Sequence, residues 1–210
     1  MADELVFYTH PMSRGRIVRW MLEEVGQPYR TEVLDFGASM KAPGYLSINP
    51  MGKVPAIRHG ETIVTEAAAI CAYLADVFPD ASLAPPPVER GSYYRWMFFA
   101  AGPVEAALSN KSLGVEVPPE RRGMLGYGSV EAVLHTLEFA VSQSDYLAGD
   151  RFSAADVYVG SQIGFGLMFG SMEKRPAFER YWGRISTRPA AVRAREMDDA
   201  LLPPRTHTAG

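Results

Sequence analysis

One stretch of the sequence, residues 49–74, restricts the fold more than any other. It opens with the turn Gly52-Lys53-Val54-Pro55, continues through a short apolar hairpin and ends in an alanine-rich segment. An X-Pro bond is the one kind of peptide bond in which the cis form costs only about 0.5–1 kcal/mol. A proline at the start of a strand also leaves neighbouring edge groups unpaired. The turn therefore predicts a cis Val54-Pro55 bond whose adjacent backbone can pair with an extended peptide.

The alanine-rich segment predicts a helix with an acidic residue at its start. Glu66 comes just before apolar residues at helical spacing, namely Ile70, Leu74 and Val77. The first N–H groups of a helix have no partner inside it, so they can hold the carboxylate of a ligand. Together with the turn, this helix start predicts a site for a peptide.

The N-terminal residues predict a β-α-β unit. An apolar run, residues 5–8, is followed by apolar residues at helical spacing from Arg14 to Val25, and Gly26 is placed to cap that helix. Residues 29–34 favour a second strand, parallel to the first and joined to it by a right-handed crossover. The hairpin adds two further strands at residues 56–58 and 62–65.

The sequence after the run Ala84-Pro85-Pro86-Pro87 favours helices only. We expect them at about residues 88–110, 119–141, 154–169, 177–186 and 189–201. Gly102-Pro103 predicts a kink or bulge in the first of them, and Ser153 with Asp156 forms a capping box at the start of the third. The expected organisation is a first domain at residues 1–80, a linker at 81–87 and an all-helical domain at 88–210.

Charge and cysteine content exclude several classes of function. The chain has 210 residues and a net charge of −3 with scattered arginines, which is a poor match for nucleic acid. A single cysteine, Cys71, cannot form an internal disulfide or a zinc site. The acidic start and the lack of a long apolar run favour a soluble, cytoplasmic protein without a membrane segment.

The order of Tyr8, Ser13, Val54-Pro55 and Glu66 resembles the cytosolic glutathione S-transferases, in particular bacterial-type members with a serine at the first helix. The resemblance covers nearly the whole chain. It implies a thioredoxin-like α/β domain with the order β-α-β-α-β-β-α, followed by an all-α domain. It also implies glutathione as co-substrate, no metal, and a homodimer.

By this resemblance a hydroxyl near the first helix would hydrogen-bond to the glutathione sulfur. A free thiol with a pKa near 8.5 is only a few per cent thiolate at neutral pH. A hydrogen bond to a charged group contributes roughly 1.5–3 kcal/mol, enough to lower that pKa by about one to two units. Ser13 is the first candidate and Tyr8 its rival, while Thr9 and the backbone near Met12 stay open.

The remaining glutathione contacts also follow from the resemblance. The Val54 backbone beside Pro55 would pair with the cysteinyl part, and Glu66 with the N–H of Ala67 would hold the γ-glutamyl end. Lys41 and Lys53 would attract the glycine carboxylate, although a lone lysine is typical of any solvated surface. Many members have serine at position 67, so Ala67 lacks one donor worth about 0.5–1.5 kcal/mol.

The second substrate would be an apolar electrophile. Met12, Phe99 and Pro103 are candidates for its pocket, because Gly102-Pro103 interrupts a helix rich in aromatic residues. Aromatic residues at helical spacing equally favour a plain core. The sequence does not identify the electrophile.

The leading functional prediction is a transferase that adds the glutathione thiolate to an electrophilic carbon. The alternatives are a non-catalytic binding or regulatory protein of the same fold, or a glutathione-dependent isomerase or peroxidase. Ser13 stands where members active in disulfide exchange have cysteine, and the Ser-Ser-Cys motif of the isomerases is absent. These two observations disfavour the redox and isomerase alternatives.

Overall fold

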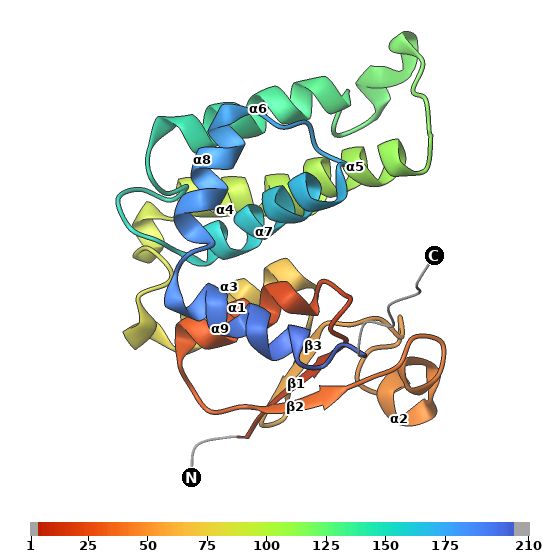
Figure 1. Cartoon of the computed structure of the whole chain (residues 1–210), viewed down its shortest axis with the longest axis vertical. Coiled ribbons are helices and arrows are strands. Elements are labelled where there is room, and N and C mark those ends of the chain that lie inside the picture. Colours follow the sequence, from red (N-terminus) through yellow and green to blue (C-terminus); the bar gives the residue numbers. More distant parts are fainter. Residues whose placement is uncertain (1–3, 204–210) are drawn as a thin grey trace, which may run out of the picture. The chain divides into compact units, whose positions relative to one another are not determined.

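The computed structural model describes residues 4–203; residues 1–3 and 204–210 lie outside the described residues. The chain forms two compact units. One contains the chain up to Ile70 together with the segment that begins at Pro189, and the other runs from Cys71 to Arg188. In Figure 1 the first unit combines the red and orange segments with the blue helix α9.

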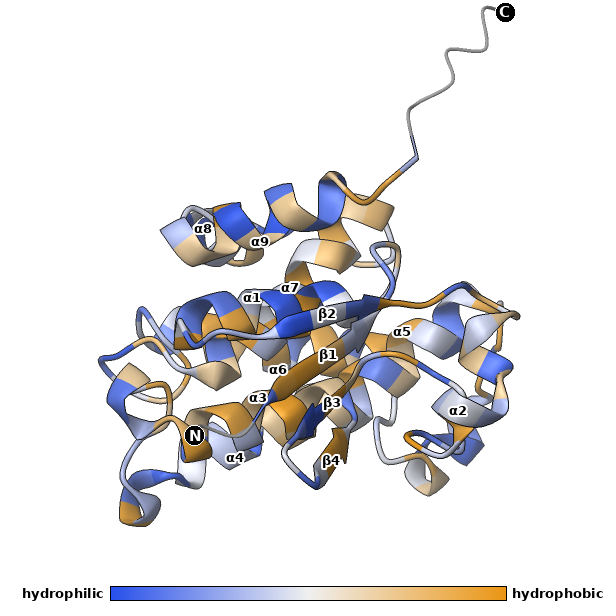
Figure 2. Cartoon of the chain, turned by 90° about the horizontal axis from the view of Figure 1, so that it is seen from below, coloured by the Kyte–Doolittle hydropathy of each residue, from blue (hydrophilic) through white to orange (hydrophobic). Residues whose placement is uncertain are grey.

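The first unit is built on a four-stranded mixed sheet. Its strands are β1 (Leu5–Thr9), β2 (Arg30–Val33), β3 (Ala56–His59) and β4 (Thr62–Thr65), in the order β2-β1-β3-β4. β1 is parallel to β2 and antiparallel to β3, and β3 and β4 form the hairpin. Figure 2 shows the central strand β1 as hydrophobic and the edge strand β2 as hydrophilic. This difference fits their burial, because β1 is mostly buried and β2 is partly exposed. The predicted α/β fold is confirmed.

The two faces of this sheet carry different helices. The helical elements of the unit are α1 (Gly15–Val25), a 3₁₀ turn (Ser39–Lys41), α2 (Pro43–Leu46), the start of α3 (Ala67–Val77) and α9 (Pro189–Asp199). Phe7 faces α1, because the Arg19 guanidinium lies 5.2 Å from its ring centre. Tyr8, the next residue, points to the opposite face, where it packs against Met40 and Tyr45.

Helix α1 follows the pattern that its sequence predicts. Ile17, Val18 and Met21 are fully buried. Gly26 has φ 72° and its N–H donates to the carbonyl of Leu22 at 2.9 Å, so it is the left-handed C-cap expected from the sequence.

The second unit is helical. Its elements are the remainder of α3, 3₁₀ turns at Pro79–Ala81, Pro87–Glu89 and Pro119–Met124, α4 (Gly91–Phe99), a π-helical segment (Ala100–Val104), α5 (Glu105–Ser112), α6 (Val130–Gln143), α7 (Ala154–Phe169) and α8 (Pro176–Ile185). The π-helical segment is the bulge expected at Gly102-Pro103. Between residues 4 and 203 no helix combines the length and apolar character needed to cross a membrane.

One expected helix was wrong. The sequence predicted a continuous helix over residues 119–141, but α6 begins only at Val130. Gly128 has φ 66°, a conformation that a helix interior does not contain. Ser129 then caps α6, accepting the N–H of Ala132 at 3.2 Å. The positive φ of Gly128 and the cap at Ser129 therefore determine where α6 begins, although the apolar spacing continues on both sides of them.

The capping box at α7 is present and belongs to a larger buried group. Asp156, which is fully buried, accepts hydrogen bonds from the Ser153 N–H and hydroxyl at 2.9 and 3.0 Å. It also accepts the N–H of Leu147 at 2.9 Å and the hydroxyl of Tyr181, on α8, at 2.7 Å. Burial raises the pKa of the Asp156 carboxyl, and these four donors oppose the shift.

Replacing Tyr181 by phenylalanine is expected to destabilise the protein by about 1.5–3 kcal/mol, because a buried hydrogen bond to a charged acceptor is lost. Urea unfolding at neutral pH measures the change. Tyr158→Phe is the matched control, since Tyr158 is also buried and its hydroxyl accepts a long, 3.4 Å hydrogen bond from the neutral amide of Gln162. Equal losses in the two variants would contradict the prediction.

Helix α9 explains why the compact units differ from the domain bounds expected from the sequence. It follows the helical region along the chain, yet it packs against α1 of the first unit. Arg19 of α1 donates to Asp198 of α9 at 2.6 Å, and both side chains are 1% exposed. The contact between α1 and α9 therefore places α9 in the first unit, and the composition of the chain does not predict this contact.

Candidate functional site

Several loops meet at one end of the sheet. Thr9, the last residue of β1, is level with Val33 at the end of β2, and the neighbouring Tyr8 is opposite Ala56, the first residue of β3. Ala56 is in turn opposite Thr65, the last residue of β4. Because these strand ends are aligned, the loop after β1, the Val54-Pro55 turn and Glu66 all leave the sheet at the same end.

Ser13 lies in the loop between β1 and α1, which we call the Ser13 loop (residues 10–14). Its hydroxyl donates to the His10 carbonyl at 2.6 Å and accepts the N–H of Gly15 at 2.9 Å. The hydroxyl therefore sits at the positive end of α1, where an anion is stabilised. A Cβ at Gly15 would overlap the Thr9 hydroxyl and lie 2.9 Å from Ser13 Oγ, so only glycine lets the helix start this close to both.

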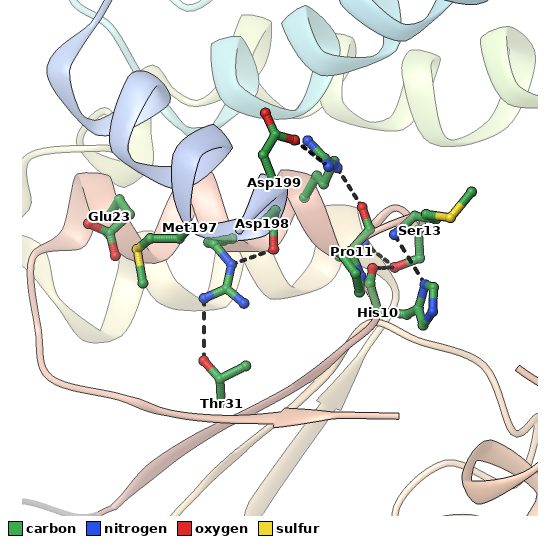
Figure 3. Close-up of polar contacts among 12 residues, drawn as sticks. His10, Pro11, Ser13, Glu23, Thr31, Met197, Asp198 and Asp199 are labelled. Atoms are coloured by element: carbon green, nitrogen blue, oxygen red, sulfur yellow. Dashed lines mark hydrogen bonds and ion pairs between the residues drawn. The ribbon is translucent and has the colours of Figure 1, made fainter. Parts of the chain in front are cut away.

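Further contacts fix the Ser13 loop (Figure 3). The N–H of Met12 donates to His10 Nδ1 at 3.1 Å, and Arg16 Nε donates to the Pro11 carbonyl at 2.5 Å. The sequence analysis named neither His10 nor Arg16 as a site residue. A proline with an arginine five positions later is a common pattern, so the sequence does not indicate that Arg16 contacts this loop.

Tyr8, the rival candidate, occupies a different environment. Its ring centre lies 5.6 Å from that of Tyr45, on the sheet face opposite α1, and its hydroxyl interacts with Arg58. Burial raises the pKa of Tyr45 to about 12. Tyr8 thus lies on the sheet face opposite α1, whereas Ser13 lies in the loop that leads into α1.

The Val54-Pro55 bond is cis, as predicted. Within residues 4–203 neither the N–H nor the carbonyl of Val54 takes a hydrogen-bond partner. The preceding carbonyl, that of Lys53, accepts the hydroxyl of Tyr45 at 2.6 Å and the amide of Asn49 at 2.9 Å. The turn is therefore held on one side while the Val54 backbone stays available to a ligand.

Asn49 is a site residue that the sequence analysis missed. Besides holding the Lys53 carbonyl, its side chain accepts the N–H of Met51 at 3.1 Å, and it is buried. Asparagine before Pro-x-Gly is a recognised turn signal, so the pattern Asn49-Pro50-Met51-Gly52 could have indicated this role.

Glu66 begins α3 in an unusual backbone conformation. Its φ is 67°, in the left-handed region that non-glycine residues rarely adopt, and its carbonyl accepts the N–H of Ile70 at 2.9 Å. Its side chain is exposed, whereas Ala67 is buried. Such strain costs about 1–3 kcal/mol and concentrates at functional sites.

The two lysines differ in their contacts. Lys41 Nζ donates to the carbonyl of Met51 at 3.0 Å, next to the tightly packed Gly52. The Lys53 side chain is exposed. Both residues belong to the first unit, as do all the other candidates for glutathione binding.

The electrophile candidates belong to both units. Met12 is 71% exposed in the first unit, and Phe99 and Pro103 are partly buried in the second. Of the other aromatic residues on α4, Tyr93 and Trp96 are buried and serve as core.

Cys71 is fully buried on α3, and burial raises the pKa of its thiol. A buried thiol with a raised pKa is a poor nucleophile. Among the described residues no group of three or more His, Cys, Asp or Glu side chains is arranged to hold a metal ion.

Comparisons with known proteins match both halves of the chain. The model for the glutathione S-transferase N-terminal domain matches residues 12–77, and that for the C-terminal domain matches residues 127–189. The chain belongs to the cytosolic glutathione S-transferase family. Like other members of this family, it combines a four-stranded mixed sheet and its helices with a helical C-terminal region.

Individual members of the glutathione S-transferase family match most of the chain. Glutathione S-transferase F9 of Arabidopsis thaliana is 28% identical over 208 residues, which cover 88% of this chain and 93% of that protein. The structure of a sphingomonad glutathione S-transferase complexed with glutathione is 27% identical, with a TM-score of 0.74, and covers 92% of this chain and 98% of its own.

A relative with a different name also matches. Elongation factor 1-gamma 3 of Oryza sativa subsp. japonica is 26% identical over 169 residues, which cover 76% of this chain and 40% of that protein. Similarity to this family therefore extends to proteins that are not named as transferases.

Proposed function

We propose that this protein is a glutathione S-transferase in which Ser13 stabilises the glutathione thiolate. The observation that carries the proposal is the Ser13 hydroxyl at the start of α1, at the same sheet end as the unpaired Val54 backbone. On glutathione binding, the hydroxyl turns from the His10 carbonyl to the sulfur. The carbonyl keeps the N–H of Ser13, which donates to it at 3.0 Å.

The reaction needs no covalent enzyme intermediate. The thiol proton passes to solvent, the sulfur forms a bond to an electrophilic carbon of an apolar substrate, and a halide or another anion leaves with the bonding electrons. Ser13 lowers the free energy of the thiolate, and the binding site supplies proximity. Met12, Phe99 and Pro103 stay the candidates for contact with the electrophile that the sequence predicts.

The other glutathione contacts are assigned to separate parts of the peptide. Val54 pairs with the cysteinyl backbone beside Pro55, and Glu66 with the N–H of Ala67 holds the γ-glutamyl end. Lys41 and Lys53 attract the glycine carboxylate, because ammonium groups complement its charge. The domain bounds predicted from the sequence, a homodimer and a cytoplasmic location are further parts of this proposal and rest on the family alone.

Glutathione titration followed by ultraviolet absorbance of the thiolate tests the proposal. The pH of half-ionisation of bound glutathione is expected to lie about one to two units below that of the free thiol, as one charged hydrogen bond allows. Binding without such a shift would contradict Ser13 activation. Absence of binding would favour the regulatory alternative, which the match to an elongation factor supports.

Replacing Glu66 by alanine is expected to weaken glutathione binding by about 10- to 100-fold, since a hydrogen bond to a charged group contributes roughly 1.5–3 kcal/mol. Isothermal titration calorimetry measures the dissociation constant. Glu61→Ala, a change at an exposed residue of the hairpin turn, is the control. Unaltered affinity of the Glu66 variant would contradict the γ-glutamyl assignment.

A further inference from the structure

Arg16 connects the Ser13 loop to helix α9. Its Nε donates to the Pro11 carbonyl at 2.5 Å, and its second terminal nitrogen donates to Asp199 at 2.7 Å (Figure 3). A guanidinium is a rigid, planar fork, so two partners on different edges fix its orientation. The Arg16 side chain is 24% exposed and that of Asp199 is 53% exposed, which leaves the pair partly shielded from water.

The peptide plane between Pro11 and Met12 is held at both of its ends. Its carbonyl accepts the charged Arg16 donor, and its N–H donates to His10 Nδ1 at 3.1 Å. The next residue, Ser13, places both its N–H and its hydroxyl on the His10 carbonyl, at 3.0 and 2.6 Å. Any rotation of this peptide plane therefore displaces the Ser13 hydroxyl.

We propose that Arg16 and Asp199 are positioning residues that hold the Ser13 loop in the conformation that presents Ser13 Oγ to the glutathione sulfur. The proposal rests on the function proposed above. Hydrogen bonds with a charged donor are roughly twice as strong as neutral ones, and the contact from Arg16 to the Pro11 carbonyl is of this kind. Helix α9 thereby contributes to the thiol site without touching it.

The same two helices provide a matched control. Arg193 of α9 pairs with Glu23 of α1 at 3.1 Å and donates to the Glu23 carbonyl at 3.3 Å. This pair also joins α9 to α1, but both of its hydrogen bonds end on Glu23, about two and a half helical turns along α1 from the end of the Ser13 loop. Removing it loosens α9 and leaves the Ser13 loop intact, which separates positioning from helix docking.

The experiment compares Arg16→Met, Asp199→Asn, their double variant and Arg193→Met in the full-length protein. We expect Arg16→Met to raise the pKa of bound glutathione by about one unit and to lower kcat about tenfold, with KM for glutathione changed less than about twofold. Asp199→Asn is expected to lower kcat about threefold, and the double variant no further than Arg16→Met, since coupled residues are not additive. Arg193→Met is expected to lower the Tm while kcat and the thiol pKa stay unchanged.

Three results would overturn the positioning role. If Arg16→Met and Arg193→Met changed kcat and the thiol pKa alike, Arg16 would serve only to dock α9. If Ser13→Ala, measured in parallel, raised the thiol pKa while Arg16→Met did not, the positioning role alone would be wrong. If Ser13→Ala itself left the thiol pKa unchanged, the proposed function would fail and the positioning role would fall with it.

Discussion

Replacing Ser13 by alanine is expected to lower turnover of a model aryl halide by about 10- to 100-fold, because the pKa of the bound thiol rises by about one to two units when the hydrogen bond is lost. The affinity for glutathione should stay within about twofold, since the γ-glutamyl and cysteinyl contacts lie elsewhere. Steady-state kinetics at neutral pH measures kcat and KM. The loss in kcat should shrink at high pH, where glutathione ionises without help.

The same substitution has a structural effect that must be separated from the chemical one. Ser13 Oγ accepts the N–H of Gly15, the first residue of α1, and loss of one such hydrogen bond costs about 0.5–1.5 kcal/mol. A thermal unfolding curve shows whether the variant remains folded at the assay temperature. Tyr8→Phe is the control: it should retain turnover, because its hydroxyl lies on the other face of the sheet with Arg58. A large loss in Tyr8→Phe with none in Ser13→Ala would transfer the role to Tyr8.

The features of the fold and of the site that the sequence predicted are those set by short-range rules. The cis Val54-Pro55 bond, the glycine cap at Gly26 and the Ser153 capping box each depend on residues within a few positions of one another. Proline, glycine and serine each favour a particular local backbone geometry at such positions, so the sequence alone predicts that geometry. They were sufficient to place the turn and two helix ends.

Long-range contacts left no comparable signal. Arg16 and Asp199 are 183 positions apart, and Arg19 and Asp198 are 179 apart. In the sequence they are only charged residues on amphipathic helices. The strained backbone of Glu66 was also invisible, because nothing in Thr65-Glu66-Ala67 requires a positive φ. Pairing between distant elements therefore had to come from the structure.

Breaking the buried ion pair between Arg19 and Asp198 is expected to have the largest effect on stability. Both side chains are 1% exposed, and Arg19 also donates weakly to Tyr29 and Thr31 at 3.3 Å. Arg19→Met leaves a buried carboxylate without its cation, which costs about 3–5 kcal/mol. Urea unfolding at pH 7 measures the loss. Arg193→Met, at the exposed α9 pair, should cost less than about 1 kcal/mol.

The double variant Arg19→Met/Asp198→Leu should recover most of that loss, because exchange of a whole buried pair for apolar side chains is often neutral. Two atoms of the native pair, one terminal nitrogen of Arg19 and Asp198 Oδ2, have no hydrogen-bond partner among the described residues, so the pair is imperfect to begin with. A double variant as unstable as Arg19→Met would show that shape, not charge, determines the cost.

The pH dependence of Arg19→Met gives an independent check. Burial raises the pKa of the Asp198 carboxyl, and the Arg19 guanidinium acts in the opposite direction, so removal of Arg19 should raise that pKa further. A carboxyl with a raised pKa binds more protons in the folded state than in the unfolded state, and stability then falls as the pH rises between the two pKa values. Lowering the pH from about 7 to about 5 should therefore return part of the lost stability to Arg19→Met. The double variant has no such carboxyl and should lack this recovery, which assigns the pH effect to Asp198 itself.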